Sequence, residues 1–302
     1  LAIETQRAGG LQPDGTLRFN GQGTATADGL RRATELGQVA RVATALAGRT
    51  SYRASLGFVR GEAEVNVTSN LVGLALNLPA PLAKAAETPL ALRYQTTVEP
   101  LVAGQPARDT LRFELGGIVQ AQYLRELPSN NGPRVLRGGI GVMAPAPTPA
   151  DGVAATVALK TLVSDEWDSV AERLIGTADG RDASAKGGYF PDAVNLRVQE
   201  LSAGPRRLTN VSAGLSQEAG GQWRANVDAD QLNGYVEYRP PQRRAGTAAA
   251  GGRVHARLSR LSLPKSDVEQ VESLLDQQPS TMPALDIVID DFELRGKHLG
   301  RV

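Results

Sequence analysis

Apolar and polar residues alternate with a period of two along most of this 302-residue chain. Successive side chains of an extended strand point to opposite faces, so each such segment has one apolar and one polar face. This one-sided pattern is typical of antiparallel sheets, because parallel sheets are usually buried on both faces. Arg60-Gly61, between the first two segments, predicts a hairpin turn. The segments with this pattern are 54–58, 63–67, 92–98, 111–115, 153–159, 194–198, 223–227, 232–238, 254–258 and 285–289.

Three shorter segments have the i, i+3, i+4 spacing of an amphipathic helix instead. The first is expected over residues 28–48 with Asp28 as its N-cap, the second over 164–176, and the third over 266–279 with a capping box at its start. The predicted fold class is therefore β-dominated α+β. We expect a long twisted antiparallel sheet of repeated meanders that forms a groove, with about three short amphipathic helices.

A proline-rich segment, residues 144–151, separates two halves of similar length. We interpret residues 1–143 as a first β-groove segment with a helical insert, 144–151 as a spacer, and 152–302 as a second β-groove segment. An internal repeat supports the β-groove interpretation of the second half, because residues 194–211 resemble 285–302 when Val198 is aligned with Ile289. The repeat predicts a β-bulge between Ile289 and Phe292. We also expect the last repeat to be truncated, as in a fragment of a longer repeating protein.

The composition excludes several classes of function. Basic and acidic residues number 33 and 32, and this near-balance argues against a nucleic-acid-binding protein, which would carry a basic surplus. The chain has no cysteine, so it has no disulfide, thiolate zinc site or cysteine nucleophile. Its sequence contains no apolar run of about 18 residues that would span a bilayer.

Catalytic and metal-binding motifs are also missing from the sequence. The acidic cluster near the end, Asp286, Asp290, Asp291 and Glu293, is best interpreted as solvated charge along a strand. Neither of the two histidines has another ligand at metal-binding spacing. We therefore predict a protein without catalytic residues, metal or cofactor, and hence not an enzyme.

The apolar strand faces need more cover than three short helices provide. Either two sheets pack on each other as a sandwich, or part of the apolar surface stays open for an apolar ligand. A third hypothesis, a glycan-acting enzyme, would require two converging carboxylates. The candidate residues for an open lipid groove are Leu56, Phe58, Val65, Val67, Leu196, Val198, Val227, Val236, Ile287 and Ile289.

Several segments resemble the YhdP family of AsmA-like envelope proteins of Gram-negative bacteria. They are Tyr52–Tyr94, the ending PALDIVIDDFELRGKHLGRV, and the segments GGQWRANVDADQLNGYVEYRP and GRVHARLSRLSLP. The resemblance implies a bridge-type lipid carrier with repeated β-groove units and no catalytic residues. Family members carry an N-terminal inner-membrane helix, which is not in this chain.

The resemblance also implies a location and partners. We expect a periplasmic segment of an inner-membrane-anchored protein that carries phospholipid acyl chains between the inner and outer membranes and supports the outer-membrane barrier. Contacts with both membranes would come from parts of the full-length protein that this chain lacks. The alternative is a non-catalytic structural or adaptor module of the envelope with a closed β-sandwich.

Overall fold

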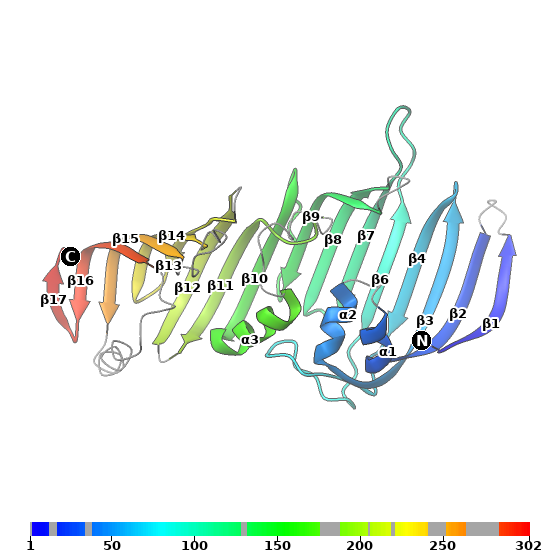
Figure 1. Cartoon of the computed structure of the whole chain (residues 1–302), viewed down its shortest axis with the longest axis horizontal. Helices are drawn as coiled ribbons and strands as arrows, with labels where there is room; N and C mark the ends of the chain where they lie inside the picture. The colour runs from blue at the N-terminus through cyan, green and yellow to red at the C-terminus, as the bar shows by residue number, and fades with distance from the viewer. Residues whose placement is uncertain are drawn as a thin grey trace, which may run out of the picture. The chain divides into compact units, whose positions relative to one another are not determined.

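The computed structural model describes residues 2–11, 17–33, 38–127, 132–175, 188–204, 206–218, 221–240, 252–263 and 284–302. Strands dominate the described chain, and three short α-helices accompany them (Figure 1). The chain forms two compact units, one of Leu1–Thr156 and Glu166–Pro191, the other of Val157–Asp165 and Asp192–Val302. The predicted β-dominated α+β class, with a mostly antiparallel open sheet, is confirmed.

The first unit is built on an antiparallel meander, in which each strand pairs with the next. Short β5 (Leu74–Leu76) stands apart and pairs with the first residues of β3. Strand β10 (Gly152–Val163) pairs with β9, and its residues are divided between the two units. The meander consists of β1 (Ala2–Leu11), β2 (Leu17–Thr26), β3 (Leu46–Val59), β4 (Glu62–Ser69), β6 (Leu92–Val98), β7 (Arg108–Leu115), β8 (Val119–Glu126) and β9 (Arg134–Val142).

The predicted hairpin joins β3 to β4. Arg60 and Gly61 both have positive φ angles, 53° and 88°. Positive φ at both central residues is the mark of the type I′ turn, whose twist matches that of the flanking strands. The hairpin prediction is therefore confirmed.

The first helical segment is shorter and more broken than expected. It consists of α1 (Ala27–Arg32), α2 (Gln38–Val42) and the 3₁₀ turn η2 (Ala43–Ala45), after which Leu46 begins β3. The N-cap of α1 is Thr26, whose side-chain oxygen accepts a hydrogen bond from the Gly29 amide at 3.0 Å. The prediction of Asp28 as N-cap is wrong, because β2 ends at Thr26 and the helix begins directly after it, two residues earlier than expected.

The second predicted helix is confirmed as α3 (Ser164–Ile175), which begins at the expected serine. Its expected end at Gly176 lies outside the described residues. The third predicted helix, over 266–279, also lies outside the described residues.

The second unit repeats the antiparallel arrangement, with one exception. Strands β11 (Ala193–Ala203), β12 (Arg206–Gln217), β13 (Trp223–Asp228), β14 (Leu232–Arg239) and β15 (Arg253–Leu263) pair in sequence order. Strand β16 (Ala284–Leu294) then pairs parallel to β15, and β17 (Lys297–Gly300) pairs antiparallel to β16. The sequence pattern predicted antiparallel pairs throughout. A parallel pair needs a connection of about a dozen residues or more, and residues 264–283 provide that length.

The two repeats predicted from sequence have matching backbone geometry. Val198 pairs with Val211 in the first repeat, and in the second Ile289 and Val302 exchange two backbone hydrogen bonds of 2.8 and 2.9 Å. Ile289 and Phe292 pack in one cluster although they are three residues apart. Strict alternation would place them on opposite faces, so one extra residue must intervene, as the predicted bulge requires. The pairing of β16 with β17 shifts register next to Phe292.

Residues 144–151, predicted as a spacer, connect β9 to β10 and run close to β9. A Cβ atom on Gly139 would lie 1.7 Å from the Pro147 carbonyl oxygen, and one on Gly141 would lie 2.1 Å from that of Ala144. Only glycine permits this approach. The division into segments 1–143 and 152–302 stays a prediction.

Candidate functional site

The strand register of the second unit aligns its apolar residues in continuous rows. Paired residues of neighbouring strands project from the same face of the sheet. We call the resulting surface the apolar face of the second unit. One row contains Leu196, Ala213, Val227, Gly234, Leu258 and Ile289, and the next contains Val194, Leu215, Ala225, Val236, Ala256 and Ile287.

All six groove candidates of the second unit lie on this face. Val198 and Ile289 are buried, with 3% and 7% of their surface exposed, whereas Ile287 is 43% exposed. Leu196, Val227 and Val236 are half-buried. Among the described residues, those packed around them belong to β10–β16 or to the turn after β13.

The first unit has an equivalent apolar face. Its rows contain Phe19, Leu56 and Val65, and then Gly21, Ala54, Val67, Tyr94, Phe113, Ala121 and Ile140. The remaining groove candidates, Leu56, Phe58, Val65 and Val67, all lie on this face. Leu56 and Phe58 are each 37% exposed.

Other parts of the first unit cover this face in two places. The segment after β4 contributes Leu71, Leu74 and Leu76 to a cluster around Leu115 on β7. Tyr189 packs with a second cluster that contains Tyr123. Apart from β5, the described strands of each unit form a single sheet layer, so the alternative of a closed β-sandwich is wrong for the part of the chain described within either unit.

A buried ion pair interrupts the apolar face of the first unit. Asp109 on β7 and Arg125 on β8 are paired residues, 2% and 7% exposed. The guanidinium of Arg125 donates two hydrogen bonds to the Asp109 carboxylate, of 2.8 and 2.5 Å. A third, of 2.9 Å, goes to the Tyr189 hydroxyl, while the Tyr123 hydroxyl donates to the Tyr189 carbonyl oxygen at 3.1 Å. The network holds Tyr189 against the sheet.

The electrostatics of this network follow from its burial. Burial by itself lowers the pKa of Arg125, but its hydrogen bonds to Asp109 and Tyr189 outweigh that effect and raise the pKa. Burial raises the pKa of Tyr123 to about 12. The guanidinium and the phenol therefore keep their protons at neutral pH, which maintains the hydrogen bonds.

Sequence reasoning missed the Asp109–Arg125 network, although a signal was present. Asp109 stands two residues before Leu111, and Arg125 stands two residues after Tyr123. Residues two apart on a strand point to the same face, so both charged side chains are expected on the apolar face. A charged residue in such a position must be paired when it is buried.

Each residue of the acidic cluster near the end of the chain has a side-chain partner, an ion pair for the three aspartates and a hydrogen bond for Glu293. Asp286 accepts a hydrogen bond of 3.0 Å from Arg257 on the neighbouring strand, and this bond lowers the pKa of the carboxyl group. His255 lies 3.7 Å from the same carboxylate. The described residues contain no group of three or more side chains that could hold a metal ion. None of the described helices has the length and apolar character needed to cross a membrane.

The sequence pattern that defines the family described as "YhdP protein" matches residues 2–302. The chain belongs to the YhdP family. The resemblance predicted from separate segments is thereby confirmed, and the YhdP match also includes the stretch between them. Among curated proteins and among solved structures, nothing matches the chain.

Proposed function

We propose that this YhdP-family chain carries phospholipid acyl chains along its apolar sheet faces, as the periplasmic part of an inner-membrane-anchored protein. Transport would run between the inner and outer membranes, need no catalytic residue or cofactor, and support the outer-membrane barrier. The observation that supports this most is the continuous apolar rows on one face of each unit, with exposed members such as Ile287 and Leu56.

The energetics of acyl chains favour such a surface. Each CH₂ group moved out of water gains about 0.8 kcal/mol, or roughly 12 kcal/mol for a chain of about sixteen carbons. A row across six strands spans roughly 24 Å at about 4.8 Å per strand spacing, more than the roughly 15 Å depth of one bilayer leaflet. One row is therefore long enough for a whole acyl chain, which could slide along it while the head group stays in water.

Site-specific photocrosslinking in the natural full-length protein tests this proposal. A photoreactive residue at Ile287 or Leu56 should form phospholipid adducts, and one at the adjacent Asp286 or Ser55, on the opposite face, should form few. Equal labelling on both faces, or no adduct at any of the four positions, would reject the proposal. Circular dichroism of each variant verifies that the fold is intact.

Introducing negative charge on the apolar faces gives a second measurement. Aspartate at both Leu56 and Ile287 should abolish adducts at a third apolar position, Val236, because a carboxylate cannot enter an acyl path without a large desolvation cost. Aspartate at Ser55 and Val288, on the opposite faces, is the matched control and should leave the adducts unchanged.

A further inference from the structure

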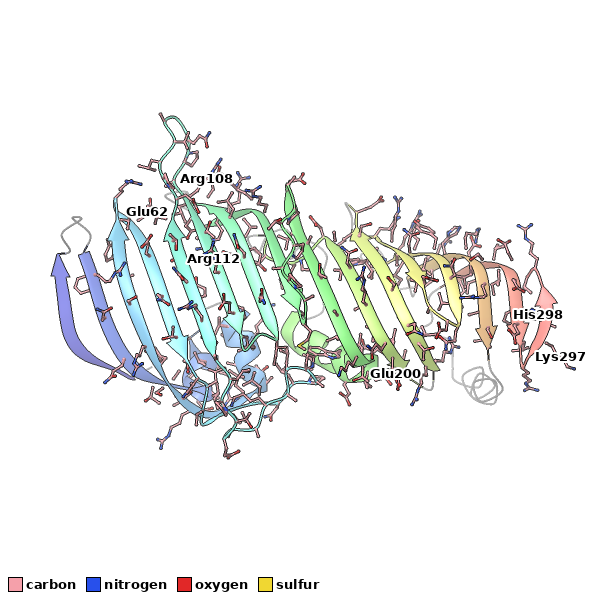
Figure 2. All side chains as sticks on the ribbon, turned by 180° about the vertical axis from the view of Figure 1, so that it is seen from behind. Glu62, Arg108, Arg112, Glu200, Lys297 and His298 are labelled. Atoms are coloured by element: carbon pink, nitrogen blue, oxygen red, sulfur yellow. The ribbon has the colours of Figure 1, made fainter. Side chains whose placement is uncertain are left out.

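The polar face of β2, β3 and β4 carries an ordered array of side chains. It lies opposite the apolar face, and Figure 2, which labels Glu62 on β4 and Arg112 on β7, looks onto it. Strand pairing arranges the array in rows of Asn20, Ser55 and Asn66, then Gln22, Arg53 and Thr68, then Thr24 and Ser51, with Asn70 following β4. Arg53 at the centre is surrounded by uncharged polar groups.

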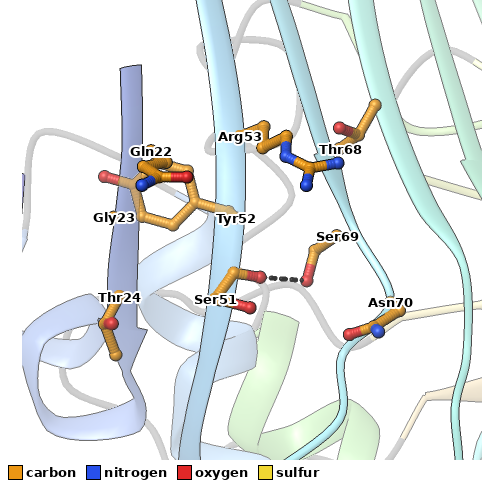
Figure 3. Close-up of a pocket in the computed structure, with 9 residues that line it drawn as sticks. All are labelled: Gln22, Gly23, Thr24, Ser51, Tyr52, Arg53, Thr68, Ser69 and Asn70. Carbon is orange, nitrogen blue, oxygen red and sulfur yellow. Dashed lines mark hydrogen bonds between the residues drawn. The ribbon is translucent and has the colours of Figure 1, made fainter. Parts of the chain in front are cut away.

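The surface that this array forms is concave. Two adjoining depressions share Gln22, Arg53 and Thr68, so they form one continuous hollow across the three strands, which we call the polar hollow. Figure 3 shows Arg53 extending from β3 toward Thr68 on β4, with Gln22 on the other side. None of the residues that line the hollow is acidic.

The Arg53 guanidinium gives the polar hollow a positive charge. No acidic residue of the described chain forms an ion pair with Arg53. The neighbour of Thr68 on β6 is Arg93, a second guanidinium on the same face, whose own partner on β7 is Glu114. Two acidic residues, Glu62 and Glu64, lie on the same face of β4 but outside the hollow, and Glu64 accepts a hydrogen bond from the Val98 amide at 2.9 Å. Among the residues that line the hollow, Arg53 alone is charged.

Hydrogen bonds fix the rim of the polar hollow. The Ser69 hydroxyl donates to the Ser51 carbonyl oxygen at 2.7 Å and accepts from the Leu71 amide at 3.0 Å. The Asn70 side-chain oxygen accepts from the Val72 amide at 3.2 Å, which leaves its NH₂ group available. Because these rim residues are already held in place, they lose little conformational entropy when a ligand binds.

One buried acceptor of the hollow lacks a partner. The side-chain oxygen of Asn66 is inaccessible to solvent and accepts no hydrogen bond from the residues that the structure describes. An unsatisfied buried acceptor is costly.

We propose that the polar hollow binds an oxyanion, phosphate or carboxylate, carried on a hydroxyl-bearing group. The Arg53 guanidinium matches the paired oxygens of such an anion, and hydroxyl and amide groups of Gln22, Thr24 and Thr68 suit the hydroxyls of the carrier. A lipid head group and a soluble phosphate ester share this chemistry. The site is on the face opposite the proposed acyl path and does not depend on it.

Titration of the protein with glycerol 3-phosphate, followed by amide NMR, tests the proposal. Gln22, Arg53 and Thr68 should shift together, and R53Q should weaken binding by about ten- to a hundredfold, the usual loss when a charge-assisted hydrogen bond is removed. R18Q is the matched control, because Arg18 lies on the same face of β2 outside the hollow. The proposal fails if these amides do not shift, or if R18Q weakens binding as much as R53Q.

A vesicle experiment distinguishes the two sources of the anion. Flotation with phosphatidylglycerol in phosphatidylcholine vesicles that depends on Arg53 would identify a lipid head group. Binding of glycerol 3-phosphate without Arg53-dependent flotation would identify a soluble ester. If neither probe binds in an Arg53-dependent manner, the proposal is wrong. Photocrosslinking at Ile287 should be unchanged by R53Q, so a failure here is separate from a failure of the acyl path.

Discussion

The apolar faces of the two units have the same sequence pattern but differ in how they are covered. In the first unit, side chains from the segment after β4 and from Tyr189 pack onto the sheet. In the second unit, the described residues that pack around the face come from the sheet strands and the turn after β13. The contrast is visible in two leucines, since Leu115 is 8% exposed and Leu285 is 63% exposed.

This difference indicates two uses for one pattern. Where other segments cover the face, it forms a hydrophobic core that stabilises the fold. Where the apolar face is open, an apolar ligand that covers it would still lower the free energy by removing apolar surface from water. If this is correct, substitutions on the covered face should cost stability, and matched ones on the open face should not.

The largest effect is expected from Arg125→Ala. It leaves the Asp109 carboxylate buried without a partner and should lower the free energy of unfolding by about 3–5 kcal/mol. Urea denaturation measures this loss. Arg134→Ala is the control, because Arg134 is exposed and pairs with Glu126 at the surface, where removal should cost less than about 1 kcal/mol. Equal losses would show that the covered face has no special role.

The two leucines provide the most direct comparison of the faces. Leu115→Ala should destabilise by about 2–5 kcal/mol, because it removes buried methyl groups and leaves a cavity. Leu285→Ala should change the free energy of unfolding by less than about 0.5 kcal/mol. Both variants are measured by urea denaturation, and a large loss in Leu285→Ala would mean that the second face is also covered.

Alkaline pH should weaken the network around Tyr189. The pKa of Tyr123 is raised from 10.0 to about 12 by burial, so the folded state holds this proton more tightly than the unfolded state. Its contribution, about 2–3 kcal/mol, is complete below pH 10 and is lost as the pH rises from 10 to 12. Tyr123→Phe should reduce this pH dependence, measured by urea denaturation at several pH values. An unchanged dependence would contradict the assignment to Tyr123.

The smallest effect is expected for Tyr189→Phe. It removes the acceptor of one Arg125 hydrogen bond and should cost about 1 kcal/mol. Tyr238→Phe in the second unit is the control, because the described residues form no hydrogen bond with the Tyr238 hydroxyl. Thermal denaturation of both variants detects the difference, and equal midpoints would mean that the hydroxyl of Tyr189 adds nothing.

Much of the fold could be predicted because alternation is a local property. The hairpin of β3 and β4, the strands around the groove candidates and the bulge after Ile289 all followed from residue spacing. Strand β9 did not, because glycines occupy positions where side chains would reveal the pattern. Gly138 is required there, since a Cβ atom would lie 2.2 Å from the ring of Tyr123. Its neighbour Gly139 is required by the approach of Pro147.

The sequence by itself determined that strands form, that each has one apolar face, and that the chain resembles the YhdP family. These conclusions rest on a backbone geometry that repeats every two residues. Only the tertiary structure decided which parts of those faces are covered, that β15 and β16 run parallel, and that Asp109 and Arg125 are buried together. Such features depend on segments far apart in the sequence. Tyr189, for example, accepts a hydrogen bond from Arg125, which is 64 residues earlier in the chain.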